Sequence, residues 1–466
     1  MEHYIFYCKL SLLAVLSLIT ACCMLSRRWY VNLAAFLACL SGETFLAHLF
    51  FPGYMLCPAA ASFIILFLSR IWDLSRTPAK GNGADPIRLP VRSGIRESRL
   101  EFHYHYSNFL VYGGAGSGKT KSIGKWLLSE YMRLGFAGFI YDFKDTDYTR
   151  TAYNLIKRHR YPHKFYYVSF DRPERSYRFN PLKVVRDRTE LIQLMEDVLL
   201  ALLPKKEQQN EWVAGGLGIL RGVAFRFWDE FPEHCTLPHI LAFIMTASAR
   251  QLSLFLQQNL VSEMLAGAYL KAEGSEKTQA SYLSTLCNNL ATISQNEEIA
   301  YVLSGDDFDF NLIDPENPKL FAVSNNFSKN SVYAPVISML MTISARQFSM
   351  QNRVPFVYFL DEMTTVNIKN FETLPSVLRE YKAAFILLTQ SGAKLENLYG
   401  KLDRSSVEAN FGNMFLGRTK DVEALKYYPL FFGKEEKERR SRSSGKSGAS
   451  SSSSVTVSSQ KEDIYQ

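Results

Sequence analysis

The chain has 466 residues, enough for about three domains of ordinary size. Its 53 lysines and arginines exceed its 45 aspartates and glutamates, and the resulting charge of +8 permits an anionic partner without requiring one. With 47% hydrophobic and 21% charged residues, the composition excludes a wholly disordered or fibrous protein. Seven cysteines exclude a disulfide scaffold, and the absence of CxxC and HExxH spacings argues against a zinc site.

The chain opens with two long apolar stretches, residues 4–25 and 31–51, and a shorter one, residues 52–69. The first contains only Lys9 as a charged residue and the second only Glu43, so both are long enough to span a bilayer. An excess of basic residues from 70 to 100 indicates a cytoplasmic flank. We therefore expect residues 1–70 to form a multi-pass transmembrane anchor of two or three helices. A cleaved signal peptide and buried core helices are the alternatives.

Prolines and glycines then predict a linker over residues 71–100. Beyond it, short apolar runs alternate with helical patterns, which is typical of an α/β fold with a parallel sheet. The strands are expected at residues 108–112, 137–142, 165–170, 319–324, 356–361, 384–389 and 413–417.

Residues 187–302 contain only helix-period patterns, among them 189–203, 212–231, 238–254 and 277–303. We expect an all-α domain inserted between the two parts of the sheet domain, residues 101–186 and 303–430. Residues 431–466 are first densely charged and then rich in serine, so we expect a flexible tail. The abrupt ending also suggests that the C-terminus is incomplete.

A glycine-rich segment follows the first expected strand and precedes a helical pattern from Thr120 to about Leu134. It fits G-x-x-x-x-G-K-[ST] with Gly113, Gly114, Ala115, Gly116, Ser117, Gly118, Lys119 and Thr120. The glycines let backbone N–H groups converge on phosphates at a helix N-terminus. We expect Lys119 to reach the outer phosphates of ATP and Thr120 to bind Mg²⁺. The alternative is a chance glycine turn before a helix.

Acidic and amide side chains follow two later strands. Asp361 and Glu362 end the strand at 356–361, where Asp361 would hold Mg²⁺ and Glu362 would polarise the attacking water. Gln390 follows the next strand and is expected beside the γ-phosphate, with a helix-capping amide as the alternative. Residues 142–145 end the second strand, and charge neutralisation at the site and a solvated turn explain them equally well.

Two arginines are candidates to act on the nucleotide of a neighbouring subunit. Arg379 lies on a short predicted helix, residues 374–382, which we expect at the sheet edge beside the nucleotide. A guanidinium there could contact a γ-phosphate in trans or form a surface salt bridge. Arg418, after the last strand, is the competing candidate, and we favour Arg379.

Together these motifs resemble the type IV coupling proteins, the membrane-anchored hexameric ATPases of conjugative DNA transfer, and within them the TraG/MobC-like group. The resemblance rests on the order of the anchor, GGAGSGKT at 113–120, IYDFKD at 140–145, RFNPL at 178–182, the helical insertion, VYFLDEMTT at 357–365 and LLTQS at 387–391. It implies a RecA-like P-loop NTPase that forms a homo-hexamer in the bacterial inner membrane with its motor domain in the cytoplasm. It also implies three partners, namely a relaxase–DNA complex, single-stranded DNA and type IV secretion channel proteins.

Three functions compete at this point. The first is an ATPase that drives single-stranded DNA transfer, the second an FtsK-like translocase of double-stranded DNA, and the third a secretion ATPase that receives protein substrates. An FtsK-like protein would usually carry a C-terminal DNA-reading module, and no segment of this sequence resembles a winged helix. The sequence does not separate the first function from the third.

Overall fold

The computed structural model describes residues 85–93, 96–144, 146–203, 208–429, 434–447 and 450–463. The chain divides into two compact units, Met1–Ala84 and Asp85–Gln466. The first unit carries the predicted membrane anchor and the first part of the predicted linker, residues 71–84, and it lies outside the described residues. Within the described ranges, no helix is both long enough and apolar enough to cross a membrane.

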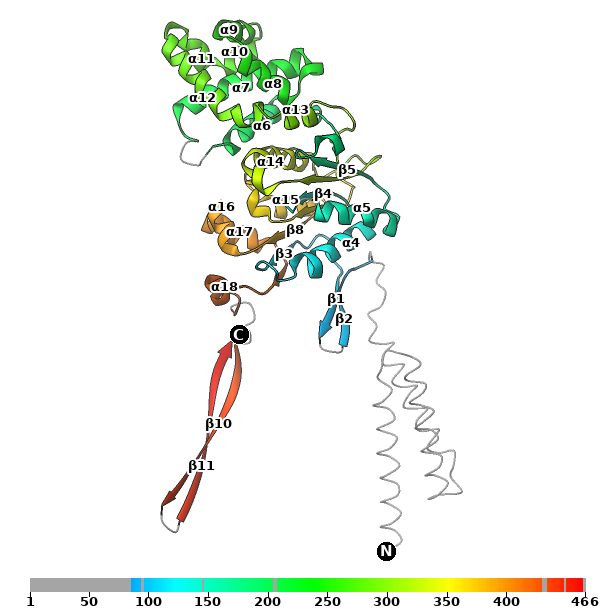
Figure 1. Ribbon diagram of the computed structural model, residues 1–466, viewed down its shortest axis with the longest axis vertical. Helices are drawn as coiled ribbons and strands as arrows, with labels where there is room; N and C mark the ends of the chain where they lie inside the picture. Colours follow the sequence, from blue (N-terminus) through cyan, green and yellow to red (C-terminus); the bar gives the residue numbers. More distant parts are fainter. Residues whose placement is uncertain are drawn as a thin grey trace, which may run out of the picture. The chain divides into compact units, whose positions relative to one another are not determined.

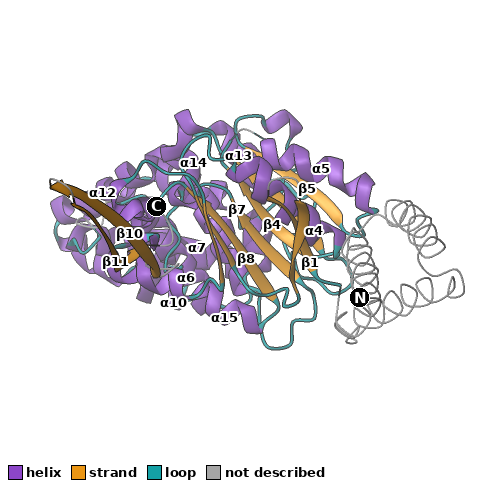
Figure 2. Cartoon of the chain, turned by 90° about the horizontal axis from the view of Figure 1, so that it is seen from below, coloured by secondary structure: helices purple, strands orange, loops and turns teal. Residues whose placement is uncertain are grey.

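A seven-stranded sheet forms the centre of the second unit. Its strand order is β5-β6-β4-β7-β8-β3-β9, and every neighbouring pair in it is parallel. The strands are β3 (Phe109–Tyr112), β4 (Ala137–Asp142), β5 (Lys164–Ser169), β6 (Lys319–Ser324), β7 (Phe356–Leu360), β8 (Ala383–Thr389) and β9 (Asn413–Leu416). Figure 2 shows strands of this sheet side by side, with helices around them. The predicted parallel α/β sheet is therefore confirmed, with each strand end within about a residue of its predicted position.

Successive strand residues point to opposite faces of the sheet, and each face packs against an apolar core. Phe109 and Val111 belong to one apolar core with α4 (Lys125–Arg133) and α5 (Asp147–His159). Leu110 and Tyr112 belong to the opposite core. That core also contains residues of α14 (Asn330–Arg346), α15 (Leu374–Glu380), α16 (Gly392–Tyr399) and α17 (Lys401–Ala409). Burial on both faces explains why the strands are continuous apolar runs in the sequence.

Helices alone connect β5 to β6 in residues 187–303 of the described chain (Figure 1). They are α6 (Arg188–Ala201), α7 (Glu211–Glu230), α8 (Leu237–Thr246), α9 (Ala249–Gln257), α10 (Leu260–Leu265), α11 (Gly267–Lys271), α12 (Glu276–Ser294) and α13 (Glu297–Leu303). Helix α7 is central, since it contacts α6 and each of α8 to α12. Helices α6 and α12 also contact α14 of the sheet domain.

Two of the predicted long helices are each divided in the structure. The segment predicted at 238–254 breaks at Ser248, whose side chain accepts a hydrogen bond from Gln251 N and caps α9. The segment predicted at 277–303 breaks at Asn296, whose side chain caps α13 in the same way. Both residues are good N-caps, and they start a new helix inside an otherwise continuous apolar pattern.

Short elements complete the described chain. They are the 3₁₀ turns η2 (Pro173–Arg175), η3 (Pro181–Val184), η4 (Pro232–His234), η5 (Ala272–Gly274), η6 (Phe327–Lys329) and η7 (Met363–Thr365), and the helix α18 (Val422–Tyr427).

Part of the segment predicted as a linker is instead an antiparallel hairpin. Strand β1 (Ile87–Ser93) pairs with β2 (Arg96–Phe102). Ile87 and Leu89 are buried in the core that contains α4, so their two-residue spacing is that of a strand with one buried face. Pro90 masks this pattern in the sequence, although proline is tolerated where both strands are edges.

The segment predicted as a flexible tail also differs. Strands β10 (Lys434–Ser447) and β11 (Ser450–Asp463) pair in an antiparallel hairpin along their whole length. The composition argues only that these residues bury no core, whereas strand pairing uses backbone groups that nearly every residue has. The β-branched run 455–457 favours a strand, and the register sets Glu436 opposite Lys461.

Candidate nucleotide-binding site

The glycine-rich loop, residues 113–118, leads from β3 into a π-helical turn, η1 (Lys119–Gly124), which continues as α4. The expected regular helix from Thr120 is thus wound differently in its first turn. Gly116 and Gly118 have φ values of 74° and 89°, which glycine adopts without steric cost. A Cβ on Gly113 would lie 2.4 Å from Ser117 Oγ, so a larger residue here would displace the Ser117 side chain.

Lys119 is buried at the centre of the site, and its Nζ donates a hydrogen bond to the Gly113 carbonyl. Burial lowers the pKa of Lys119. The carboxylates of Glu362 and Asp361 raise this pKa, whereas the neighbouring Lys144 and Lys394 lower it. All five groups therefore lie close enough to interact. Three lysine side chains thus surround this site, and cations favour a polyphosphate ligand.

Two buried carboxylates follow β7. Asp361 is 1% exposed, and burial is the main reason that its pKa rises to about 7. Glu362 is 2% exposed and has the left-handed backbone conformation, with φ of 45°. Lys394 Nζ, from the first turn of α16, lies 3.4 Å from Glu362 Oε1.

The ends of β8 and β4 complete the surroundings of the loop. Gly113 N donates to the Thr389 carbonyl at 3.3 Å, which sets half-buried Gln390 beside the loop. From the end of β4, Lys144 Nζ donates to Thr120 Oγ1 at 3.4 Å. Asp142 is fully buried and accepts hydrogen bonds from the backbone and hydroxyl of Thr149. Asp142 is therefore not part of a solvated turn, since it fixes the start of α5, and the exposed Lys144 reaches the loop.

Three buried oxygens around the loop have no hydrogen-bond partner among the described residues. They are Ser117 Oγ, Asp361 Oδ2 and Thr389 Oγ1, which come from the loop and from the ends of β7 and β8. Strands β7, β8 and β3 are neighbours in the sheet, so these atoms belong to one edge. Buried polar atoms normally have partners, and a bound ion or ligand would satisfy these three. The residues fit a magnesium–nucleotide complex.

The two arginine candidates lie at opposite edges of the sheet. Helix α15 ends at Glu380 and β8 begins at Ala383, so Arg379 lies at the edge where the strands start. The expectation that it lies beside its own nucleotide site is therefore wrong, because the chain must return to the amino edge before β8. Arg418 follows β9, and its carbonyl accepts from Gly114 N at 3.0 Å. Both side chains are exposed.

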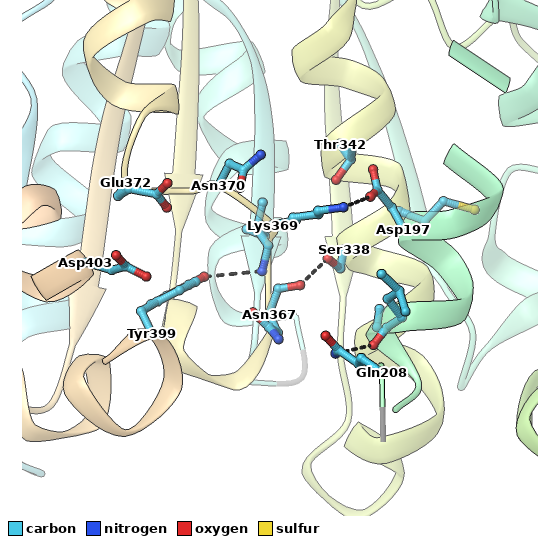
Figure 3. Close-up of a pocket in the computed structure, with 14 residues that line it drawn as sticks. Asp197, Gln208, Ser338, Thr342, Asn367, Lys369, Asn370, Glu372, Tyr399 and Asp403 are labelled. Atoms are coloured by element: carbon cyan, nitrogen blue, oxygen red, sulfur yellow. Dashed lines mark hydrogen bonds and ion pairs between the residues drawn. The ribbon is translucent and has the colours of Figure 1, made fainter. Parts of the chain in front are cut away.

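Sequence reasoning missed several residues at this site and at the contact between the helical region and the sheet domain. Lys394 is one of them, and its only sequence signal is its position four residues after Gln390. Another is Asp197 of α6, which pairs with Arg346 of α14 at 2.6 Å and with Lys369 of the segment after β7 at 3.1 Å. Figure 3 shows Asp197 and Lys369 meeting across a polar cavity of about 200 Å³ between the helical region and the sheet domain.

A parallel sheet with a phosphate loop after β3 and carboxylates after β7 is the RecA-like α/β fold. Residues 100–464 match the family model of the type IV secretion-system coupling protein DNA-binding domain. The match covers most of the chain, and the protein belongs to this family.

Solved structures of the conjugative coupling protein TrwB share the fold. The trigonal form of TrwBdeltaN70 in complex with sulphate has 16% sequence identity and a TM-score of 0.59, with 84% of each chain covered. TrwB in complex with ADP and Mg²⁺ has 16% identity and a TM-score of 0.58, with 77% of this chain and 86% of that chain covered. TrwB with the non-hydrolysable ATP analogue ADPNP has 16% identity and a TM-score of 0.57, with 78% of this chain and 86% of that chain covered. Comparison with curated protein sequences found no significant match.

Proposed function

We propose that this protein is a membrane-anchored ATPase that couples a relaxase–DNA complex to a type IV secretion channel and drives single-stranded DNA transfer in conjugation. The observation that carries the proposal is the convergence of Lys119, Asp361 and Glu362 at the carboxyl edge of the sheet. Membership of the coupling-protein family favours this function over the FtsK-like translocase.

Within the proposal, the phosphate loop binds ATP and Lys119 contacts its outer phosphates. Thr120 and Asp361 hold Mg²⁺, Glu362 polarises the attacking water, and Gln390 responds to the γ-phosphate. The orphaned oxygens around the loop support a bound metal–nucleotide complex. The complexes of TrwB with ADP and Mg²⁺ and with ADPNP support the same choice of ligand.

The proposal sets the apolar N-terminal segment in the bacterial inner membrane, with the motor domain in the cytoplasm as a homo-hexamer. The two long apolar stretches before residue 52 support the anchor, and the basic flank from residue 70 supports the orientation. Secretion channel proteins then meet the motor at the membrane.

The principal test replaces the phosphate-loop lysine in the full-length protein. Lys119→Ala should abolish ATP hydrolysis and DNA transfer while leaving membrane insertion intact. Lys121→Ala is the matched control, because Lys121 is exposed two residues further along the same turn. Normal transfer by a stably inserted Lys119→Ala protein would refute the proposal. Stimulation of hydrolysis by secreted protein but not by single-stranded DNA would favour the protein-substrate function instead.

Arg379 remains our candidate for a residue that acts on a neighbouring subunit. It is exposed and lies away from its own phosphate loop, so any contact with a γ-phosphate must be made in trans. Arg379→Ala should bind ATP but hydrolyse it at least about 10³-fold more slowly. Rings mixed from Lys119→Ala and Arg379→Ala subunits should recover part of the activity. If mixed rings assemble without recovery, and Arg418→Ala shows it instead, then Arg418 is the trans residue.

The helical region between β5 and β6 is proposed to choose the substrate. It carries none of the phosphate-binding residues, and its helices pack around α7. Exchanging residues 187–302 for the corresponding region of another coupling protein should change which relaxase is accepted. An active chimera with unchanged preference would indicate that the region only braces its neighbours.

A further inference from the structure

A chain of hydrogen bonds connects the turn that carries Glu362 to two other strands of the sheet. Thr365 Oγ1 donates to the Glu362 carbonyl at 2.7 Å, and Thr365 N reaches the same oxygen at 3.0 Å. Tyr141 Oη, from β4, lies 2.6 Å from Thr365 Oγ1. Asn325 Nδ2, directly after β6, lies 2.8 Å from Tyr141 Oη. Three segments that are far apart in the sequence are thus connected, one hydrogen bond after another, to the carbonyl of Glu362.

The direction of every proton in this chain follows from the contacts. Asn326 N donates to Asn325 Oδ1 at 2.8 Å, and a backbone N–H can only donate, so the amide of Asn325 has one orientation. Its Nδ2 must then donate to Tyr141 Oη, which leaves the phenol proton for Thr365 Oγ1. The hydroxyl proton of Thr365 in turn goes to the Glu362 carbonyl. No donor or acceptor along this path competes with another.

The chain also closes on itself. Asn325 Nδ2 contacts Asn330 Oδ1 at 2.7 Å, and Asn330 Nδ2 donates to the Thr365 carbonyl at 3.3 Å. Tyr141 and Asn325 are buried. Burial raises the pKa of Tyr141 well above its usual value, so the phenol keeps the proton that it donates. A fully satisfied buried network of this kind makes a local geometry rigid.

This rigidity matters because Glu362 has a backbone conformation that is unfavourable for a residue with a Cβ. The two hydrogen bonds from Thr365 hold its carbonyl, and the orientation of that peptide decides where the buried carboxylate points. Without them, the turn could relax and move the carboxylate away from the water that it must polarise. Small displacements of a catalytic group cost large factors in rate.

We propose that Tyr141, Thr365 and Asn325 are positioning residues for Glu362, which they hold in its left-handed conformation so that its carboxylate faces the γ-phosphate. The inference rests on the proposed ATPase function and adds to it the residues that fix the geometry of hydrolysis. In this proposal they act through Glu362.

The test compares conservative variants of the full-length protein. Tyr141→Phe and Thr365→Val remove one hydroxyl each and should lower kcat for ATP hydrolysis about 10- to 100-fold, with KM and the Kd for a fluorescent ATP analogue unchanged. Thr365→Ser keeps the hydroxyl and should restore kcat to within about 2-fold of the wild-type value. Tyr358→Phe is the matched control, because Tyr358 is a buried tyrosine of β7 whose hydroxyl contacts Ser344 rather than the turn.

A second comparison asks whether the effect passes through Glu362. In a Glu362→Gln background, single-turnover hydrolysis should not fall further when Tyr141→Phe is added, since the carboxylate is already absent. An equal loss in both backgrounds, or a kcat of Tyr141→Phe within about 2-fold of wild type, would overturn the inference while leaving the proposed function intact. If Glu362→Gln hydrolysed ATP as fast as the wild-type protein, both the inference and the proposed role of Glu362 would be overturned.

Discussion

Replacing Asp361 by asparagine should make the nucleotide-free protein more stable while removing its activity. The pKa of Asp361 rises from 3.8 to about 7, mainly because burial disfavours the carboxylate. Its Oδ2 has no hydrogen-bond partner among the described residues, so the amide breaks no bond there. In the unfolded chain the group ionises near 3.8, and above that pH folding must place an unfavourable charge in the site.

The size of the effect follows from this shift. The folded state binds the extra proton between pH 4 and 7, so the cost of Asp361 grows over that range and is complete above pH 7. The shift from 3.8 to about 7 corresponds to an upper value of about 4 kcal/mol at pH 8, and at pH 5 the cost is only about 1.5 kcal/mol. The asparagine amide does not titrate, so the variant has no such cost at either pH. The Asp361→Asn protein should therefore exceed wild type in free energy of unfolding by more at pH 8 than at pH 5.

Urea denaturation at the two pH values, with EDTA and without nucleotide, measures this difference. Asp306→Asn is the control, because Asp306 forms only an exposed ion pair with Lys183. Magnesium-dependent hydrolysis should be lost in Asp361→Asn and kept in the control. A variant that is no more stable than wild type at pH 8, or whose stability advantage does not change with pH, would refute the reasoning.

Two further changes test how the helical region is held together. Gly218→Ala should destabilise it by ~1–3 kcal/mol, since the new Cβ would lie 2.8 Å from the Leu265 carbonyl, whereas Gly267→Ala, with open space around it, should be neutral or slightly stabilising in thermal melts. Asp197→Asn should leave Arg346 and Lys369 without their shared carboxylate and speed hydrogen exchange in α6 by the equivalent of ~1–3 kcal/mol. Asp403→Asn, in the same cavity, should change exchange little, and equal exchange in both variants would contradict a bridging role for Asp197.

The sequence predicts those parts of the fold that local pattern determines. All seven strands of the sheet could be located because both of its faces are covered and the strands are uninterrupted apolar runs. The phosphate loop and Asp361-Glu362 could be located because their residue types and positions after strands are themselves the signal. The two hairpins could not, because proline in one and serine in the other hide the strand pattern of the paired segments.

Contacts between side chains that depend on the order of the strands in the sheet could not be predicted from local sequence patterns. Tyr141 and Asn325 meet at Thr365 only because β4 lies between β6 and β7 in the sheet. The predicted position of Arg379 was wrong for a related reason. The edge of the sheet at which Arg379 lies depends on where α15 ends relative to β8. The spacing of residues along the chain indicates neither the contact between Tyr141 and Asn325 nor the sheet edge at which Arg379 lies.

The two ends of the helical region are hydrogen-bonded to each other. Phe179 N donates to the Val302 carbonyl at 2.8 Å, and Asp307 N donates to the Arg178 carbonyl at the same distance. Gly305 fits against Arg178 so closely that a Cβ would lie 2.1 Å from its Cβ. The chain therefore leaves β5 and returns to β6 at neighbouring points, and the two ends of the helical region between these parallel strands are held side by side. We therefore expect that this region can be exchanged or enlarged in related proteins without altering the register of the sheet that carries the phosphate loop.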